Sequence, residues 1–173
     1  MKKIKLTKGQ FALVDSEDFE WLNQWKWCAD DNGYAVRHER KEEHGDNTRK
    51  MRKMHREILS HYRIDIEGMN IDHKNNKEYD NRKKNLRIAN CSQNMANSKL
   101  MPQNTSGYKG VIRMNKNTQH NITKPWATQI YIKGKRTFKG MFETKEEAAR
   151  AYNELAKKYF GEFARLNQIG GDI

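Results

Sequence analysis

A turn-forming segment in the second half of the chain constrains the fold most strongly. Residues 101–107, Met-Pro-Gln-Asn-Thr-Ser-Gly, combine a proline and a glycine with polar turn formers, a composition typical of a linker. This run divides the 173 residues into two parts, each of a size that buries only a modest core. We therefore expect an N-terminal module over residues 1–100, a linker over 101–107 and a C-terminal module over 108–173.

The C-terminal module has the clearest secondary-structure pattern. Alternation of apolar and polar residues predicts three strands, at Lys109–Met114, Trp126–Ile132 and Arg136–Phe142. Residues 115–124 are expected to form a polar loop and 133–135 a turn. Thr144 and Glu147 form a capping-box pattern at the start of a helix, and Gly161 suits its C-terminal cap. The helix has one apolar face, so we predict a three-stranded antiparallel sheet packed on a single helix.

The N-terminal module shows shorter and more mixed patterns, and the overall class we predict is α+β. The expected elements are a strand at Phe11–Val14, a short helix through Phe19 and Leu22, a hairpin of Trp25–Cys28 and Tyr34–Arg37, a strand at Met51–Met54, a helical turn over His55–His61 and a helix from Asn90. Residues 38–49 read as a charged loop, and little regular structure is expected within 69–98 except at its ends.

The net charge of +12 is unevenly distributed and favours a polyanionic partner. Residues 1–50 carry ten basic and ten acidic side chains, whereas 51–100 carry eleven against six and 101–173 carry thirteen against six. Basic residues placed near phosphates release condensed counterions, so this balance points to nucleic acid. A ribosomal protein or a membrane-surface binder would fit the same composition.

Cysteine usage and hydropathy narrow the class further. Cys28 and Cys91 are far apart, which gives neither a zinc-ribbon pattern nor a disulfide framework. No run approaches the roughly 18 apolar residues that span a membrane, so we expect a soluble, intracellular protein without a membrane partner.

One set of polar residues has the spacing of a catalytic motif. An Asp-His pair is followed by an asparagine twelve residues after the histidine and by another nine residues further on, in the segments Ile71–Lys74, Asp80–Arg87 and Gln93–Asn97. With these residues and spacings the first 98 residues resemble the HNH nuclease motif, in particular that of phage-encoded endonucleases, which include intron-encoded nicking homing endonucleases. The resemblance implies a ββα-metal core, duplex DNA as substrate and the cytoplasm of a bacterial or phage-infected cell.

The resemblance also implies roles for individual residues. Asp72 and Asn94 match the ligands of one divalent ion, and their oxygen donors suit Mg²⁺ or Mn²⁺. His73 matches the general base that deprotonates the attacking water, and Asn85 the residue that orients its imidazole. The third motif position is often histidine in this family, so Asn94 shifts metal preference towards hard ions. For His55, structural support and a phosphate contact remain equally open.

Several basic residues lie within the motif, at Arg82, Lys83 and Arg87. A solvated basic run would look the same, but their place in the active-site loop favours contacts with phosphates.

The C-terminal module resembles the plant ethylene-response-factor type of DNA-binding domain over residues 106–167. The matching stretches are Ser106–Val111, Trp126-Ala127, Phe138–Phe142, Glu146–Tyr152 and Ala164–Asn167. In that family the sheet enters the DNA major groove, which by position implies DNA contacts for Lys109, Gln129, Tyr131, Arg136 and Phe138. Ile112 and Met114 stand where those domains usually carry arginines, so a different target site is expected.

Taken together, these patterns predict a monomeric, site-specific, strand-nicking DNA endonuclease of the HNH type. One alternative is a non-catalytic DNA-binding regulator with a degenerate nuclease fold, although the intact Asp72, His73 and Asn94 argue against it. Another is an RNA-binding basic protein, which the absence of an aromatic RNP-type motif disfavours.

Overall fold

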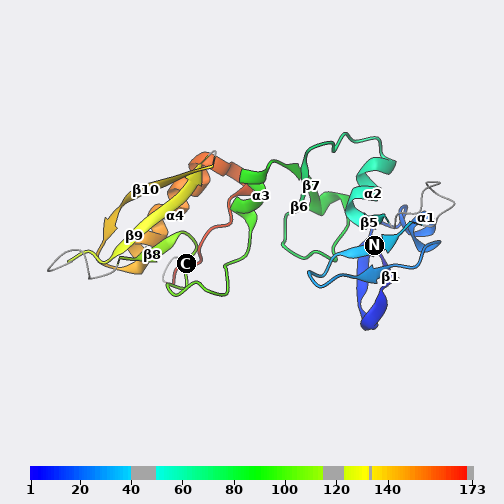
Figure 1. Ribbon diagram of the computed structural model, residues 1–173, viewed down its shortest axis with the longest axis horizontal. Coiled ribbons are helices and arrows are strands. Elements are labelled where there is room, and N and C mark those ends of the chain that lie inside the picture. Colours follow the sequence, from blue (N-terminus) through cyan, green and yellow to red (C-terminus); the bar gives the residue numbers. More distant parts are fainter. Residues whose placement is uncertain (40–49, 115–122, 133, 171–173) are drawn as a thin grey trace. The chain divides into compact units, whose positions relative to one another are not determined.

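The protein combines small sheets with a few helices, as expected for the α+β class. The computed structural model describes residues 1–39, 50–114, 123–132 and 134–170 (Figure 1). These form two compact units, Met1–Asn90 and Cys91–Ile173. The expected linker at 101–107 lies inside the second unit, and separate folding on either side of it stays a prediction. No helix within the described ranges is long and apolar enough to cross a membrane.

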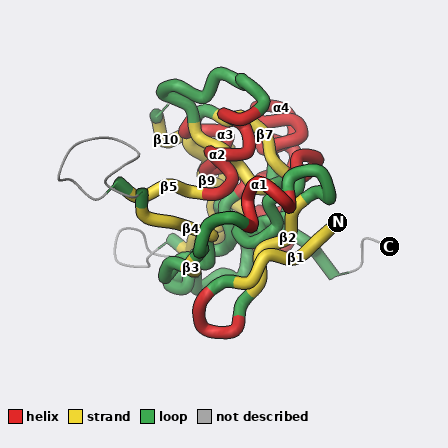
Figure 2. The backbone as a smooth tube through the Cα atoms, turned by 90° about the vertical axis from the view of Figure 1, so that its right-hand side faces the viewer, coloured by secondary structure: helices red, strands yellow, loops and turns green. Residues whose placement is uncertain are grey.

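The first unit begins with a two-stranded antiparallel ribbon (Figure 2). Its strands are β1 (Lys2–Lys5) and β2 (Phe11–Val14), joined through a 3-10 turn, η1 (Thr7–Gly9). The strand at Phe11–Val14 was predicted. Strand β1 was not, because three of its four residues are exposed lysines and only Ile4 is buried.

A second small sheet follows in the same unit, with order β3-β4-β5. Its strands and the two neighbouring helices are β3 (Cys28–Ala29), β4 (Ala35–His38), β5 (Met51–Lys53), α1 (Phe19–Asn23) and α2 (Met54–His61). The predicted hairpin is confirmed, with Cys28 opposite Val36 in the register. The expected loop at 38–49 lies mostly outside the described residues.

One hydrophobic core joins these elements. Met54 and Ile58 of α2 are fully buried against Trp27, whose indole Nε1 donates to the backbone oxygen of Leu22 at 2.8 Å. Because the indole N–H has a hydrogen-bond acceptor, burial of the large ring stabilises the core without leaving an unpaired donor.

The hairpin formed by β6 (Asn70–His73) and β7 (Leu86–Ala89) completes the first unit. Strand β7 was not predicted, since it is four residues long and follows a polar run. The loop between them, which ends in η3 (Lys83–Asn85), is attached to β2. Leu13 N donates to Tyr79 O, and Asn81 N donates to Leu13 O, both at 2.8 Å.

The second unit starts with α3 (Cys91–Asn97) and contains the predicted three-stranded sheet and helix. The elements are β8 (Val111–Arg113), β9 (Trp126–Ile132), β10 (Lys135–Phe142), α4 (Lys145–Phe160) and η5 (Gly161–Phe163), and the sheet order is β10-β9-β8. The capping box of Thr144 and Glu147 is present at the start of α4, and Gly161 is its C-cap. Most of the expected loop at 115–124 lies outside the described residues.

The sheet of the second unit is buried on one face only. Val111 packs with Ala148 and Ala149 of α4, and Ile130 packs with Tyr152. Thr128, fully buried between them, donates its hydroxyl to Ala148 O at 2.6 Å. Strand β10 is exposed along almost its whole length, so the sheet offers a broad surface away from the helix.

Candidate active site

The β6–β7 hairpin carries the Asp-His pair of the motif. Asp72 and His73 are the last two residues of β6 and are 5 % and 4 % exposed. In the antiparallel register Asp72 faces Arg87 and His73 faces Leu86. Successive side chains of a strand point to opposite faces, so the two functional groups leave the hairpin in different directions.

A network of side-chain amides and one carboxylate fixes the loop after His73. Asn85 Nδ2 donates to Asp80 O at 2.7 Å, and Asn85 Oδ1 accepts from the backbone N–H of Asn75 at 3.1 Å. Asn75 Nδ2 and the Arg82 guanidinium both donate to the Asp80 carboxylate, at 2.6–2.8 Å. These bonds lower the pKa of Asp80 and keep it ionised. Asn85 therefore braces the loop.

The imidazole of His73 is oriented by Asn81. His73 Nε2 lies 3.4 Å from Asn81 Oδ1, and Asn81 Nδ2 donates to Tyr79 O at 3.2 Å. An amide oxygen only accepts, so Nε2 carries the ring proton and the lone pair is on Nδ1. Burial lowers the pKa of His73, although Asn81 and nearby carboxylates oppose that shift. The ring is thus neutral at neutral pH and able to accept a proton.

A second buried histidine lies against the first. The rings of His55, on α2, and His73 are 5.2 Å apart at 88°, and Tyr34 lies 5.3 Å from His55 and 5.8 Å from His73. Burial, together with His73 and neighbouring cations, lowers the pKa of His55 to about 3. Its Nδ1 is buried, and none of the residues that the structure describes forms a hydrogen bond with it. His55 is therefore a neutral packing partner in this structure.

The carboxylate of Asp72 forms an ion pair across the hairpin. Arg87 Nε donates to Asp72 Oδ2 at 2.7 Å, and the two side chains are 11 % and 7 % exposed. Arg87 was predicted to contact phosphate, and that remains a prediction. Its present contact is with the proposed metal ligand.

The other two predicted phosphate contacts in this unit also have acidic partners. Arg82 binds Asp80 through two nitrogens. Lys83 pairs with Glu17, and its Nζ lies 3.7 Å from Asp18 Oδ2 and 3.8 Å from the centre of the Tyr62 ring. In this structure both cations attach the loop to its surroundings.

In the second unit, Asn94 is exposed on α3. Lys109 closes the end of that helix, because its Nζ donates to the backbone oxygens of Met95, Ala96 and Ser98 at 2.7–2.9 Å. A cation at a helix C-terminus satisfies its last carbonyls. This is a structural role for a residue that the resemblance assigned to DNA.

Four other predicted DNA contacts share the exposed face of the sheet. Arg136 is opposite Tyr131 and Phe138 is opposite Gln129, so their side chains lie together. Arg136 Nε donates to Gln129 Oε1 at 2.7 Å, and its guanidinium lies 4.6 Å from the Phe138 ring centre. Tyr131 and Phe138 are 48 % and 51 % exposed. An exposed aromatic and cationic cluster of this kind suits a nucleic-acid surface.

Sequence reasoning did not assign a role to Asn81, Asp80 or Tyr34. The first two stand inside the recognised Asp80–Arg87 segment, which was a usable signal. Tyr34 carried none, since it reaches the site from a separate hairpin. Within the described ranges, no group of three histidine, cysteine or acidic side chains could hold a metal ion.

A buried, neutral imidazole and a carboxylate on successive residues of a hairpin strand form a site suited to hydrolysis. Comparison with known proteins agrees: a relative from Acanthamoeba polyphaga mimivirus, named an uncharacterized HNH endonuclease, is 31 % identical over 168 residues, covering 94 % of this chain and 77 % of the relative. The chain therefore belongs to the HNH endonuclease family. No family model and no solved structure matches it.

Proposed function

We propose that this protein is a metal-dependent endonuclease that hydrolyses phosphodiester bonds of duplex DNA. The observation that carries the proposal is the buried, neutral imidazole of His73, which is held by Asn81. Family membership supports endonuclease activity, and the +12 charge supports a nucleic-acid substrate.

The proposed chemistry begins at Nδ1 of His73. That atom accepts a proton from the attacking water, and the proton on Nε2 keeps its bond to Asn81. Asn81 opposes rotation of the ring, so the lone pair keeps one direction without entropy being lost in the transition state. Asp80 and Asn85 support this arrangement through the loop that carries Asn81.

Asp72 and Asn94 are the proposed ligands of one Mg²⁺ or Mn²⁺ ion. Carboxylate and amide oxygens are the donors that such hard ions prefer, so the donor set fits. The ion would stabilise charge on the phosphate and the departing oxygen. The ion pair with Arg87 offsets the cost of burying the Asp72 carboxylate in this site.

The second unit is the proposed DNA reader, with an arrangement similar to the ethylene-response-factor type of domain. Its sheet face presents Gln129, Tyr131, Arg136 and Phe138, and the opposite face is covered by α4. Together the two units make a site-specific enzyme, which we propose acts as a monomer and nicks one strand.

Relaxation of supercoiled plasmid, with and without Mg²⁺, tests the proposal. Wild type should relax the plasmid only with the metal, and His73→Ala should lower the rate by about 10²–10⁴-fold with duplex affinity unchanged. His38→Ala, which removes an exposed histidine of the same unit that does not line the site, is the matched control. Duplex binding without Mg²⁺-dependent cutting would favour the non-catalytic regulator instead.

A further inference from the structure

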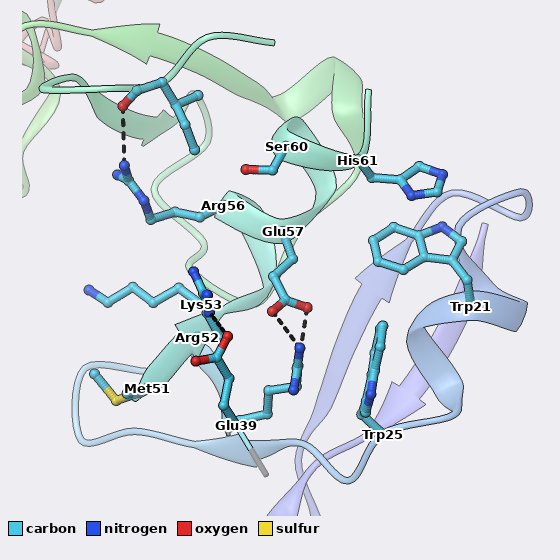
Figure 3. Close-up of a pocket in the computed structure, with 12 residues that line it drawn as sticks. Trp21, Trp25, Glu39, Met51, Arg52, Lys53, Arg56, Glu57, Ser60 and His61 are labelled. Atoms are coloured by element: carbon cyan, nitrogen blue, oxygen red, sulfur yellow. Dashed lines mark hydrogen bonds and ion pairs between the residues drawn. The ribbon is translucent and has the colours of Figure 1, made fainter. Parts of the chain in front are cut away.

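A cavity in the first unit is separate from the proposed catalytic histidine. It has a volume of about 680 Å³, within the size range of small-molecule and nucleotide sites. Its walls come from α1, α2, β5 and the ends of β4 (Figure 3). None of Asp72, His73 and Asn81 lines it.

One wall of this pocket is aromatic. Trp21 and Trp25 meet edge to face with their ring centres 6.0 Å apart, and His61 stacks on Trp21 at 4.3 Å (Figure 3). The guanidinium of Arg37 lies 4.4 Å from the Trp25 ring centre. His61 and Arg37 thus each lie against one face of a tryptophan ring. Unpaired bases stack on aromatic faces, whatever their sequence.

The opposite wall is cationic, with Arg52, Lys53 and Arg56 along it (Figure 3). The two acids of the pocket are already paired: Glu57 binds Arg37 through two bonds of 2.9 and 3.2 Å, and Glu39 binds Arg52. Four arginine and lysine side chains against two glutamates leave the lining positive. An anionic ligand is therefore favoured.

The guanidinium of Arg56 is held in place by the protein. It donates to the backbone oxygens of Ile66 at 3.1 Å and Met69 at 3.2 Å. A guanidinium has five N–H donors, so these two bonds orient the group and use only two of its donors. Such an oriented cation suits a phosphate more than a mobile lysine would.

Helix α2 links this pocket to the catalytic site. His55 faces His73, whereas Glu57 and Ser60 line the pocket. Residues two apart on a helix are rotated by about 200° around its axis, so they point to nearly opposite sides. The pocket and the site therefore lie on opposite sides of one helix, whose diameter is roughly 10 Å.

We propose that this pocket receives an unpaired deoxynucleotide of the DNA substrate, with its base against Trp21 and Trp25 and its phosphate at Arg52 and Arg56. The inference rests on the proposed action on DNA. Removing a base from the duplex costs a few kcal/mol, which stacking in such a pocket offsets. The enzyme would thereby favour sites where the duplex opens easily.

Photocrosslinking on the full chain tests this proposal directly. The probe is a duplex with one unpaired iododeoxyuridine, mixed with the protein in EDTA so that no strand is cut. A base stacked on a tryptophan crosslinks to it on irradiation. The tryptic peptide Gly9–Lys26 contains Trp21 and Trp25 and is separated from Trp27 by cleavage after Lys26. Crosslinks in this peptide are expected, and crosslinks found only elsewhere would overturn the proposal.

Variants of exposed residues at the pocket entrance give a quantitative test by DNA affinity. Ser60→Tyr should fill the pocket and lower affinity for the duplex with an unpaired base about tenfold, leaving a fully paired duplex unaffected. Arg52→Ala should weaken binding of the unpaired-base duplex and reduce its salt dependence by about 0.7–0.9 in logarithmic slope. Lys5→Ala, an exposed cation outside the pocket, is the control and should preserve the preference.

The outcomes separate this proposal from the proposed nuclease activity. Pocket crosslinks from a protein that cuts no DNA with Mg²⁺ would support the pocket and contradict the nuclease. Normal cleavage, together with an undiminished preference of Ser60→Tyr for the unpaired base, would support the nuclease and contradict the pocket.

Discussion

Asp72 and Arg87 face each other directly in the β6–β7 register, and their side chains form a nearly buried ion pair of 2.7 Å. A carboxylate at this depth without a cationic partner would be strongly destabilising. The Arg87 guanidinium therefore offsets the cost of burying the proposed metal ligand.

Arg87→Ala should lower the free energy of unfolding by about 3 kcal/mol in EDTA. Adding Mn²⁺ should restore more stability to this variant than to wild type, since the ion replaces the missing positive charge. Urea unfolding with and without Mn²⁺ measures both effects. The double variant with Asp72→Asn is the control, and it should recover stability without responding to the metal. Equal stability of Arg87→Ala and wild type in EDTA would contradict the pairing.

The orientation of His73 by Asn81 predicts a specific pH effect. Activity requires the neutral ring, so it should fall as the pH drops through the pKa of His73, below the ordinary value of about 6.5. Asn81→Asp adds a negative charge beside the ring, which raises that pKa. The acidic limb of the kcat/KM profile should therefore move to higher pH.

Asn81→Leu is the companion variant, because it removes the hydrogen bond without adding charge. It should lower kcat with little change in DNA affinity. An acidic limb that stays in place in Asn81→Asp would show that another group controls the profile.

His55 predicts how stability depends on pH. Its pKa is about 3 in the folded chain, because burial disfavours the charged ring, against about 6.5 when unfolded. Above pH 6.5 neither state is protonated. As the pH falls from 6.5 to 3, the unfolded state binds the proton first, so stability declines by on the order of 1 kcal/mol per pH unit.

His55→Phe keeps an aromatic ring against Tyr34 and His73 and cannot bind a proton. Its unfolding free energy should consequently vary less with pH in this range. Chemical denaturation at several pH values tests this, with His61→Phe as the exposed control. Identical slopes for His55→Phe and wild type would exclude His55 as the source.

Gly110 predicts a steric requirement in the second unit. Its φ is +73°, and an added Cβ would lie 2.0 Å from Tyr152 Cδ2 and 2.7 Å from Gln129 O. Gly110→Ala should therefore destabilise the unit by about 2–5 kcal/mol. Gly107 also has positive φ but has nothing within 4 Å of the added atom. Gly107→Ala should cost about 1 kcal/mol, and equal losses in the two variants would contradict the steric account. Urea unfolding compares them.

Local sequence signals predicted the elements that depend on local interactions. The strand at Phe11–Val14 and the capping box at Thr144 were both confirmed, because alternation and side-chain capping act within a few residues. Strand β7 was missed, since its pairing with β6 joins residues separated by a long polar loop.

The candidate site shows the same difference between local signals and contacts distant in sequence. The motif identified Asp72 and His73 as candidates, and their roles remain predictions. Arg87 as the partner of Asp72, and Asn81 as that of His73, became visible only once hairpin register and loop path were known. Lys109 illustrates a further limit, because a cation that closes a neighbouring helix looks in sequence like one that binds phosphate.

Strand-specific labelling of a supercoiled target tests the proposed nicking. The chain carries a single Asp72-His73 pair, and one such centre attacks one phosphodiester per binding event. A double-strand break would need two subunits related by a two-fold axis, or a slow second encounter on the other strand. The proposed arrangement of unlike units suits an asymmetric target. Open circles with label lost from one strand are therefore expected. Linear product that forms without a nicked intermediate would instead mean that two subunits act together.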